Sequence, residues 1–533
     1  MKKRKGNRSC GIDYIDGFSI KLAAPLIEDV LLHLVNLSIE KSQFPRLWKV
    51  NKVSPQFKKG DKTRGENWRP ITDIVFVSKL AEAAVFDQIA EHFSVNKLWH
   101  PNHHGFRPNH STATALSQLY DLWISKAEDQ ELSAALLLDL SAAFDVVDHK
   151  ILLEKLELYN FSAETISWFK SYLEHRRQIV VIESKLSDPK DVGEQGVPQG
   201  SLLGPILFLI FYNDFPDVRG DGSSVLYADD DTDIVSDPDP DILEQKIQQE
   251  ANRSTAWVHD NKLICSGSKT KLIIAGTKEL RKSKLISKNK VIKINVAGHE
   301  VTESESERLL GLIVNNTMTW EHHLYGNTEH KGLVSKLSQR AGLIRKLSFV
   351  MPKKRLTIMA EGIFFSLLNY CLEVFSNVWG LDTYDETNRH STAFRKEDSM
   401  KLQVLVNKVL RALTGLDRDT PVSVLSSRSG QLSVHQRTAL FSLTSVHKVL
   451  QSQEPAYSLS RLKPNQDQDE PARLQTNCKR TEYKLSISRG GYYYRSSRLY
   501  NQLPDSLVRN AKTTIFKKNA KQWVRENIPL LPP

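Results

Sequence analysis

The stretch from Ser224 to Val235 constrains the fold of this chain most strongly, because it places three consecutive aspartates between two apolar runs. Val, Leu, Tyr and Ile on both sides of a short polar break are typical of two antiparallel strands joined by a turn. Asp229, Asp230 and Asp231 would then lie at the tip of a hairpin, where successive side chains can converge. We expect Asp231 to face solvent.

A second apolar run, from Ser133 to Leu138, is followed by the single carboxylate of Asp139. If this strand packs beside the hairpin, Asp139, Asp229 and Asp230 form a cluster of oxygen ligands. Such a cluster suits Mg²⁺ rather than zinc or iron. The alternative is that the aspartates of the turn are only solvated, which is the usual state of such residues.

Three segments in a fixed order decide between these readings: Leu138–His149, Gln195–Pro205 and Tyr227–Asp230. Together they resemble the palm motifs of reverse transcriptases, most closely those of non-LTR (LINE-type, jockey-like) retrotransposons. The resemblance covers about residues 9 to 525 and is strongest from 55 to 235.

The resemblance implies an α+β right-hand polymerase fold, with fingers, an antiparallel palm sheet, a helical thumb and a mainly helical C-terminal region. It implies an RNA-directed DNA polymerase, a nucleotidyltransferase that extends the 3′-hydroxyl of a DNA primer on an RNA template with dNTPs. Two metal ions support such a transfer. We expect Asp139, Asp229 and Asp230 to be the catalytic residues and to bind two Mg²⁺ ions, with Mn²⁺ as the alternative.

The same resemblance implies contacts to the nucleotide. Phe144, five residues after Asp139, is expected to exclude a 2′-hydroxyl, although an aromatic residue at this distance from a strand is otherwise usually part of the core. Arg and Lys bind phosphate groups, and Lys269 is expected to protonate the leaving pyrophosphate. The expected nucleotide-binding residues are Phe144, Gln199, Arg69, Arg107 and Lys269.

Glycine-rich turns are expected to contact the nucleic acid. The loop around Gly196 lets backbone come close to a base pair, and Arg308–Leu312 resembles a primer-grip turn. The expected nucleic-acid-binding residues are Gly196, Pro198, Gly200, Tyr227 and Gly311.

The length of 533 residues predicts more than one structural unit. We expect an N-terminal extension and first helix over 1–40, fingers and palm with the primer-grip-like turn over 41–314, a helical thumb and connection over 315–470, and a basic C-terminal segment over 471–533. Apolar spacing predicts helices over 20–41 and 77–93, two helices within 151–173, and a strand over 178–182.

The C-terminal segment holds 13 Lys and Arg residues between Arg473 and Arg525, with tyrosines at 492–494 among them. Aromatic rings among cations favour nucleic-acid binding, which predicts a clamp. The helical spacing of Phe516, Ala520 and Val524 offers the alternative of a structural helix packed on the thumb.

Composition adds weaker constraints. The formal net charge is +11, and the chain shows no evident run of about 18 apolar residues, so we expect no membrane partner. Four scattered cysteines without CxxC spacing favour a reducing compartment, which predicts an intracellular location in the cytoplasm and/or the nucleus. The oligomeric state stays open.

Two rival functions remain. A defective or domesticated copy would bind RNA without polymerising. A polymerase of the LTR-element or group II intron type is disfavoured by the lack of a recognisable RNase H-like acidic set or maturase segment. The chain begins almost at the polymerase motifs, so we expect the upstream endonuclease of LINE-type proteins to be missing.

Overall fold

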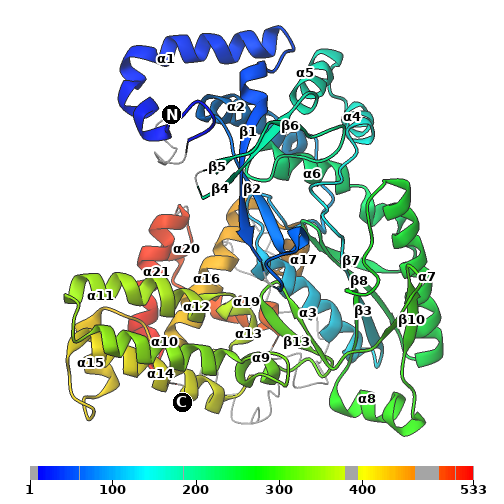
Figure 1. Cartoon of the computed structure of the whole chain (residues 1–533). Helices are drawn as coiled ribbons and strands as arrows, with labels where there is room; N and C mark the ends of the chain where they lie inside the picture. Colours follow the sequence, from blue (N-terminus) through cyan, green and yellow to red (C-terminus); the bar gives the residue numbers. More distant parts are fainter. Residues whose placement is uncertain are drawn as a thin grey trace.

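The fold is seen in a computed structural model that describes residues 10–58, 60–183, 185–378, 394–462, 491–509 and 512–531. Figure 1 shows helices and strands from the first half of the chain mainly at the top and right, and the helices that follow residue 330 at the left and in the centre. The architecture is α+β, with separate sheets followed by a helical C-terminal region, as predicted.

The central sheet carries the motif residues. It is antiparallel with the order β7-β8-β3-β9, and its strands are β7 (Ser223–Tyr227), β8 (Asp230–Asp237), β3 (Leu132–Leu138) and β9 (Lys271–Ala275). Leu136 and Val235 point into one core with helices α6 (Leu203–Tyr212) and α7 (Pro240–Asp260). Ala135 and Ile234 point into a second core with α3 (Thr112–Glu128). The sheet is therefore buried on both faces.

A second sheet is built from strands that come before and after β3 in the sequence. Its order is β2-β1-β4-β5, with β6 also paired to β4. Its strands are β1 (Val50–Phe57), β2 (Trp68–Asp73), β4 (Arg177–Ile182), β5 (Lys185–Leu186) and β6 (Lys190–Asp191). β1 and β2 form an antiparallel pair, and β1 runs parallel to β4.

The helices predicted in this half are confirmed. They are α1 (Gly17–Glu40), α2 (Phe76–Val95), α4 (His149–Leu158) and α5 (Ala163–Leu173). Asn160, between α4 and α5, has a φ of 61°. Asn tolerates this left-handed conformation, which ends the first helix.

Two hairpins follow α7 and α8 (Lys278–Lys284): β10 (Lys293–Val296) with β11 (His299–Thr302), and β12 (Ser306–Leu309) with β13 (Leu312–Asn315). The helical region then comprises α9 (Glu321–Tyr325), α10 (Leu333–Leu347), α11 (Lys353–Ala360), a π-helical turn η5 (Glu361–Phe365), α12 (Ser366–Asn369), α13 (Leu372–Phe375), α14 (Lys396–Thr414), α15 (Val422–Ser429), α16 (Val434–Ser452) and α17 (Ala456–Leu462).

The C-terminal helices are α19 (Tyr492–Tyr500), α20 (Asp505–Val508) and α21 (Thr513–Asn527). They share a third core with α16, in which Phe516, Ala520 and Val524 are fully buried. The alternative of a structural helix therefore describes the buried face of α21. The stacking role predicted for the tyrosines is wrong for Tyr493, whose ring is buried in this core. The part of the basic segment over 471–490 lies outside the described residues.

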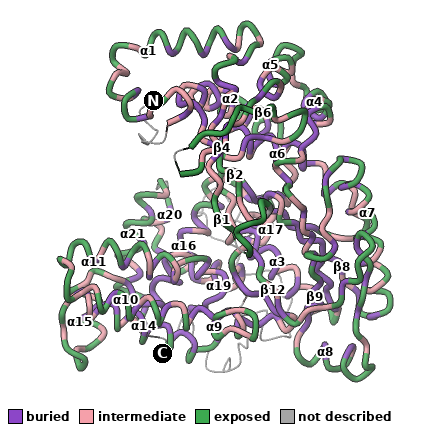
Figure 2. The backbone as a smooth tube through the Cα atoms, viewed as in Figure 1, coloured by how far each residue is buried: buried purple, intermediate pink, exposed green. Residues whose placement is uncertain are grey.

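Two helical segments are long and apolar enough to cross a membrane by length and composition, Gly17–Glu40 and Lys353–Phe375, each with a mean hydropathy of 1.5. The expectation from composition missed both. The first lies near the N-terminus and much of its surface is exposed, as Figure 2 shows. Two such helices are weak evidence, because buried core helices and signal sequences pass the same test.

Candidate active site

The sheet register brings the predicted acids to one edge. Tyr227 pairs with Asp230, so Ala228 and Asp229 form a two-residue turn, with a φ of 60° at Ala228. On the other side of β8, Leu138 pairs with Asp231. One further step along this antiparallel register sets Asp139 opposite Asp230. The predicted convergence of strand and hairpin is thus present in the backbone.

The charges of the three carboxylates act on one another. Burial raises the pKa of Asp229, and the charge of Asp139 raises it further. Burial, then Asp229, then Asp139 raise the pKa of Asp230 to about 6. A cation bound among them would relieve this repulsion.

The donor set fits the metal that the motifs imply, because carboxylate oxygens are the ligands that Mg²⁺ prefers. Among the described residues, no group of three or more His, Cys, Asp or Glu side chains is already arranged to hold a metal ion.

Basic side chains flank the acids. The charges of Arg69 and Lys58, from the β1–β2 hairpin, lower the pKa of Asp229 and offset part of the increase. Lys269 Nζ lies 3.7 Å from Asp139 Oδ2, and both side chains are exposed. Arg69, Lys58 and Lys269 thus supply positive charge at the edge where the acids meet. Lys59, the neighbouring lysine of the motif, lies outside the described residues.

Phe144 and Gln199 are tied to neighbouring motif residues. The half-buried ring of Phe144 stacks on Phe208 with centroids 4.6 Å apart. Gln199 Nε2 donates a hydrogen bond of 2.9 Å to Asp145 Oδ1. The stacking fits the alternative that Phe144 is a core residue. Because part of the ring is exposed, the prediction that it excludes a 2′-hydroxyl stays open.

The glycines of the loop pack closely against other backbone of the chain, and their contact with nucleic acid stays a prediction. Gly196 and Gly200 have φ values of 84° and 116°. A Cβ on Gly196 would stand 2.8 Å from the carbonyl oxygen of Asp145, and one on Gly200 would stand 2.6 Å from that of Thr72. Their close approach is to the chain's own backbone. Pro198 is buried, so these residues first serve the packing of the loop.

The structure does not support a nucleotide contact by Arg107. Its side chain is 8% exposed and lies 3.9 Å from Glu454. Its Nη1 donates to the carbonyl oxygens of His100 and His103, both at 2.9 Å. Burial lowers its pKa to about 10. These contacts use the guanidinium to hold the loop that precedes α3.

The primer-grip-like turn is present between β12 and β13. Leu310 and Gly311 have φ values of 46° and 88°, as a tight hairpin turn requires. Tyr370 Oη donates to the carbonyl oxygen of Leu310 at 2.7 Å. Tyr227, half-buried at the end of β7, lies close enough for its charge to affect the pKa of Tyr370. Contact of Gly311 or Tyr227 with nucleic acid stays a prediction.

Sequence reasoning was wrong about Asp231. The residue is 1% exposed and pairs with Arg219. Because side chains alternate along a strand, Asp231 points to the face covered by α6 and α7, while Asp230 points to the other face. The alternation was visible in the sequence, but Arg219 as the buried partner was not.

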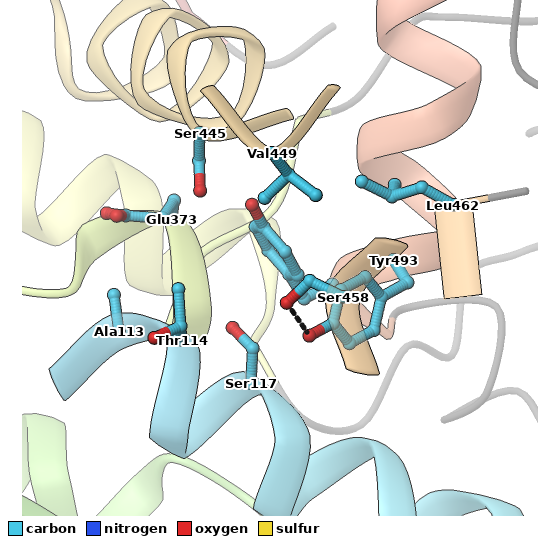
Figure 3. Close-up of a pocket in the computed structure, with 10 residues that line it drawn as sticks. Ala113, Thr114, Ser117, Glu373, Ser445, Val449, Ser458, Leu462 and Tyr493 are labelled. Carbon is cyan, nitrogen blue, oxygen red and sulfur yellow. Dashed lines mark hydrogen bonds between the residues drawn. The ribbon is translucent and has the colours of Figure 1, made fainter. Parts of the chain in front are cut away.

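A pocket lies apart from the acids, between the start of α3 and the C-terminal helices (Figure 3). It is lined by hydroxyl groups and by Glu373, and Ser458 Oγ lies 2.8 Å from Tyr493 Oη at its wall. The predicted site residues do not line it.

Comparisons with known proteins agree with the motifs. A family model described as "Reverse transcriptase (RNA-dependent DNA polymerase)" matches residues 57–314. The chain is 26% identical over 416 residues to a probable RNA-directed DNA polymerase from transposon BS of Drosophila melanogaster, covering 76% of this chain and 43% of the relative. It is 23% identical over 414 residues to the RNA-directed DNA polymerase from mobile element jockey of the same organism, covering 76% of this chain and 42% of the relative.

The chain thus spans less than half the length of these relatives. A solved telomerase from Candida tropicalis, in complex with a fragment of telomeric RNA, aligns over 81% of this chain and 68% of its own with 15% identity and a TM-score of 0.37. That TM-score is too low to support an argument about shared function.

Proposed function

Residues 57–314 belong to the reverse transcriptase (RNA-dependent DNA polymerase) family, and from this premise we propose that the chain is the RNA-directed DNA polymerase of a non-LTR retrotransposon. It extends the 3′-hydroxyl of a DNA primer along an RNA template with dNTPs. The observation that carries the proposal is the shared edge of Asp139, Asp229 and Asp230, where burial and the charges of Asp229 and Asp139 raise the pKa of Asp230 to about 6.

Asp139, Asp229 and Asp230 would hold divalent ions, Mg²⁺ or alternatively Mn²⁺. Bound there, such ions supply activation of the primer hydroxyl and stabilisation of the leaving pyrophosphate. The carboxylates orient them and balance their charge. Neither zinc nor iron suits a site of carboxylates alone.

The remaining residues act on the nucleotide. Arg69 and Lys58 attract the triphosphate, since their charges already reach Asp229. Lys269, 3.7 Å from Asp139, gives a proton to the pyrophosphate oxygen as it leaves. Phe144 limits the room beneath the sugar, which selects dNTPs over ribonucleotides.

A primer-extension assay tests the proposal. Purified protein is given poly-rA template, an oligo-dT primer, dTTP and Mg²⁺, and the products are sized on a gel. We expect stepwise extension that chelation with EDTA stops. RNA binding without extension, in Mg²⁺ and again in Mn²⁺, would overturn the proposal and favour a copy that only binds RNA.

A further inference from the structure

A buried ionic network lies beneath the aspartate hairpin. Arg219, between η3 (Phe215–Val218) and β7, is 4% exposed. Its Nη2 lies 2.5 Å from Asp233 Oδ1 and 3.3 Å from Asp231 Oδ2, and both carboxylates are fully buried. Its Nη1 donates to Ser254 Oγ at 2.5 Å. One guanidinium thus joins two positions on the same face of β8 to helix α7.

Further contacts fix the arginine itself. Its guanidinium carbon lies 4.1 Å from the centre of the Phe215 ring. Ser254 Oγ donates to Asp233 Oδ2 at 2.7 Å, which ties the same helix to the strand a second time. Glu250 accepts from the backbone of Gly220 at 3.1 Å, next to Arg219. The guanidinium therefore has little freedom to move.

Stability alone is a poor reason for this arrangement. Buried ion pairs often stabilise a fold no better than apolar residues of similar volume, because desolvation offsets the attraction. Here three acids, Asp231, Asp233 and Glu250, face two arginines, Arg219 and Arg253. The hydroxyl of Tyr212 is close enough for the charges of this network to affect its pKa. The acidic groups are in excess, so the network is electrostatically unfavourable as a core.

The ionic network also lies next to the aspartate turn, which indicates a role other than stability. Asp231 directly follows Asp230, and its backbone pairs with both Leu226 and Leu138. Asp231 is therefore the residue of β8 nearest the turn that is paired with both neighbouring strands, one position after the Tyr227–Asp230 pair that closes the turn. Arg219 holds the side chain of Asp231 on the face covered by α6 and α7. This contact therefore also restricts the backbone conformation at the adjacent Asp230.

We infer that Arg219 is a positioning residue for the proposed polymerase reaction, acting through Asp231 to hold Asp229 and Asp230 in place against Asp139. This inference rests on the proposed function. The network acts through geometry, because the side chains of Arg219, Asp231 and Asp233 are buried.

Asp231→Asn is the decisive variant, because it keeps the shape of the side chain while removing the ion pair with Arg219. Arg219→Met leaves two buried carboxylates without their partner and is the variant at risk of misfolding. Lys246→Gln is the control, since it also removes an ion pair with an acid of β8, that of Lys246 with Asp237 at 2.7 Å, but at the end of the strand far from the turn.

For Asp231→Asn we expect kcat to fall on the order of tenfold to a hundredfold, as for a misplaced catalytic group, with the KM for dTTP and the melting temperature close to wild type. Amide hydrogen exchange at residues 228–231 should become faster than in Lys246→Gln. A variant that melts earlier but keeps wild-type kcat and exchange would overturn the inference and leave a purely structural network.

The exchange measurement separates this inference from the proposed function. If wild-type protein does not extend primers, the proposed function fails, and the anchoring of the hairpin is still decided by the exchange rates. If wild-type protein is active and Asp231→Asn matches it in kcat and in exchange, only the positioning role is lost.

Discussion

Gly105 lies against the backbone of Ala228, so closely that a Cβ on Gly105 would stand 2.3 Å from the Ala228 nitrogen. The neighbouring backbone continues the contact. The amide of His104 donates to the carbonyl of Leu226 at 2.8 Å, and the amide of Leu226 donates to the carbonyl of Asn102 at 3.0 Å. The loop before α3 is thus bonded to β7, and the position of the aspartate turn depends on it.

Gly105→Ala should therefore displace the turn. We expect primer extension to fall on the order of a hundredfold, with a loss of about 1–3 kcal/mol in the free energy of unfolding from overpacking. Primer extension and urea unfolding measure the two effects. Gly342→Ala, on α10 with open space around it, is the control and should raise stability by about 0.5–1 kcal/mol. Wild-type extension by Gly105→Ala would show that the turn tolerates the shift.

Local patterns predicted the hairpin and the strand before Asp139 because alternation and turn chemistry are properties of neighbouring residues. Arg219 could not be found in this way, since it lies 12 residues from Asp231 and nothing between them marks a contact. Arg107 shows the converse. Its motif indicated a contact with nucleotide. The burial of its side chain against its own loop depends on the tertiary fold, so the motif could not predict it.

The C-terminal tyrosines show how one pattern supports two readings. Tyr493, Ser496 and Tyr500 follow helical spacing and are all buried. The same residues that suggested stacking on bases therefore also show the spacing of a core helix. Aromatic rings among cations satisfy either interpretation, and only the packing partner on α16 distinguishes them.

Asp229→Asn should abolish primer extension and leave RNA binding nearly unchanged, because it removes one expected metal ligand and keeps the shape of the side chain. Burial and Asp139 raise the pKa of Asp229, so its charge is unfavourable in the metal-free fold. The melting temperature in EDTA should stay equal or rise slightly. Calorimetry and a gel-shift assay with RNA provide the measurements, and near wild-type extension would refute the metal assignment.

Phe144→Val should admit ribonucleotides, since it cuts back the ring that is expected to stand beneath the sugar. Removing the ring that stacks on Phe208 should cost about 1–2 kcal/mol of stability. The quantity to measure is the ratio of dTTP to UTP incorporation. An unchanged ratio in an active variant would make Phe144 a core residue only.

Acid should destabilise the fold through buried histidines. Burial lowers the pKa of His323 to about 3, and His104 is lowered to about 3 in the same way. As the pH falls below 6.5, the unfolded chain binds these protons first. The stability present above pH 6.5 is therefore lost progressively between 6.5 and about 3, by up to about 1.4 kcal/mol per pH unit for each histidine.

Urea unfolding of wild type and His323→Leu at pH 7.0 and 5.0 measures this effect. His323 Nε2 is buried without a hydrogen-bond partner, so the leucine variant loses little there and its stability should depend less on pH. The exposed His33 serves as the control in His33→Gln, which should keep the wild-type dependence. Equal pH dependence in His323→Leu and wild type would contradict the assignment.

Packing and nucleic-acid binding can be tested separately on helix α21, because one face of the helix is buried and the other carries exposed lysines. Phe516 is fully buried, whereas Lys517 and Lys521 are exposed on the same helix. Phe516→Ala should cost about 3–5 kcal/mol of stability. Reversing the charge of both lysines to Glu should leave the melting temperature close to wild type and reduce the slope of log Kd for RNA against log salt, by about 0.7 for each phosphate that the variant no longer binds.

The matched control reverses Lys278 and Lys282 to Glu on α8, which have the same spacing and the same change in net charge on a distant helix (Figure 1). If the outer face of α21 binds RNA, only the α21 variant changes the salt slope, because counterion release follows local binding of phosphates. If both pairs change it equally, net charge alone is responsible. An unchanged slope in both variants would leave α21 with the structural role that its buried face already shows.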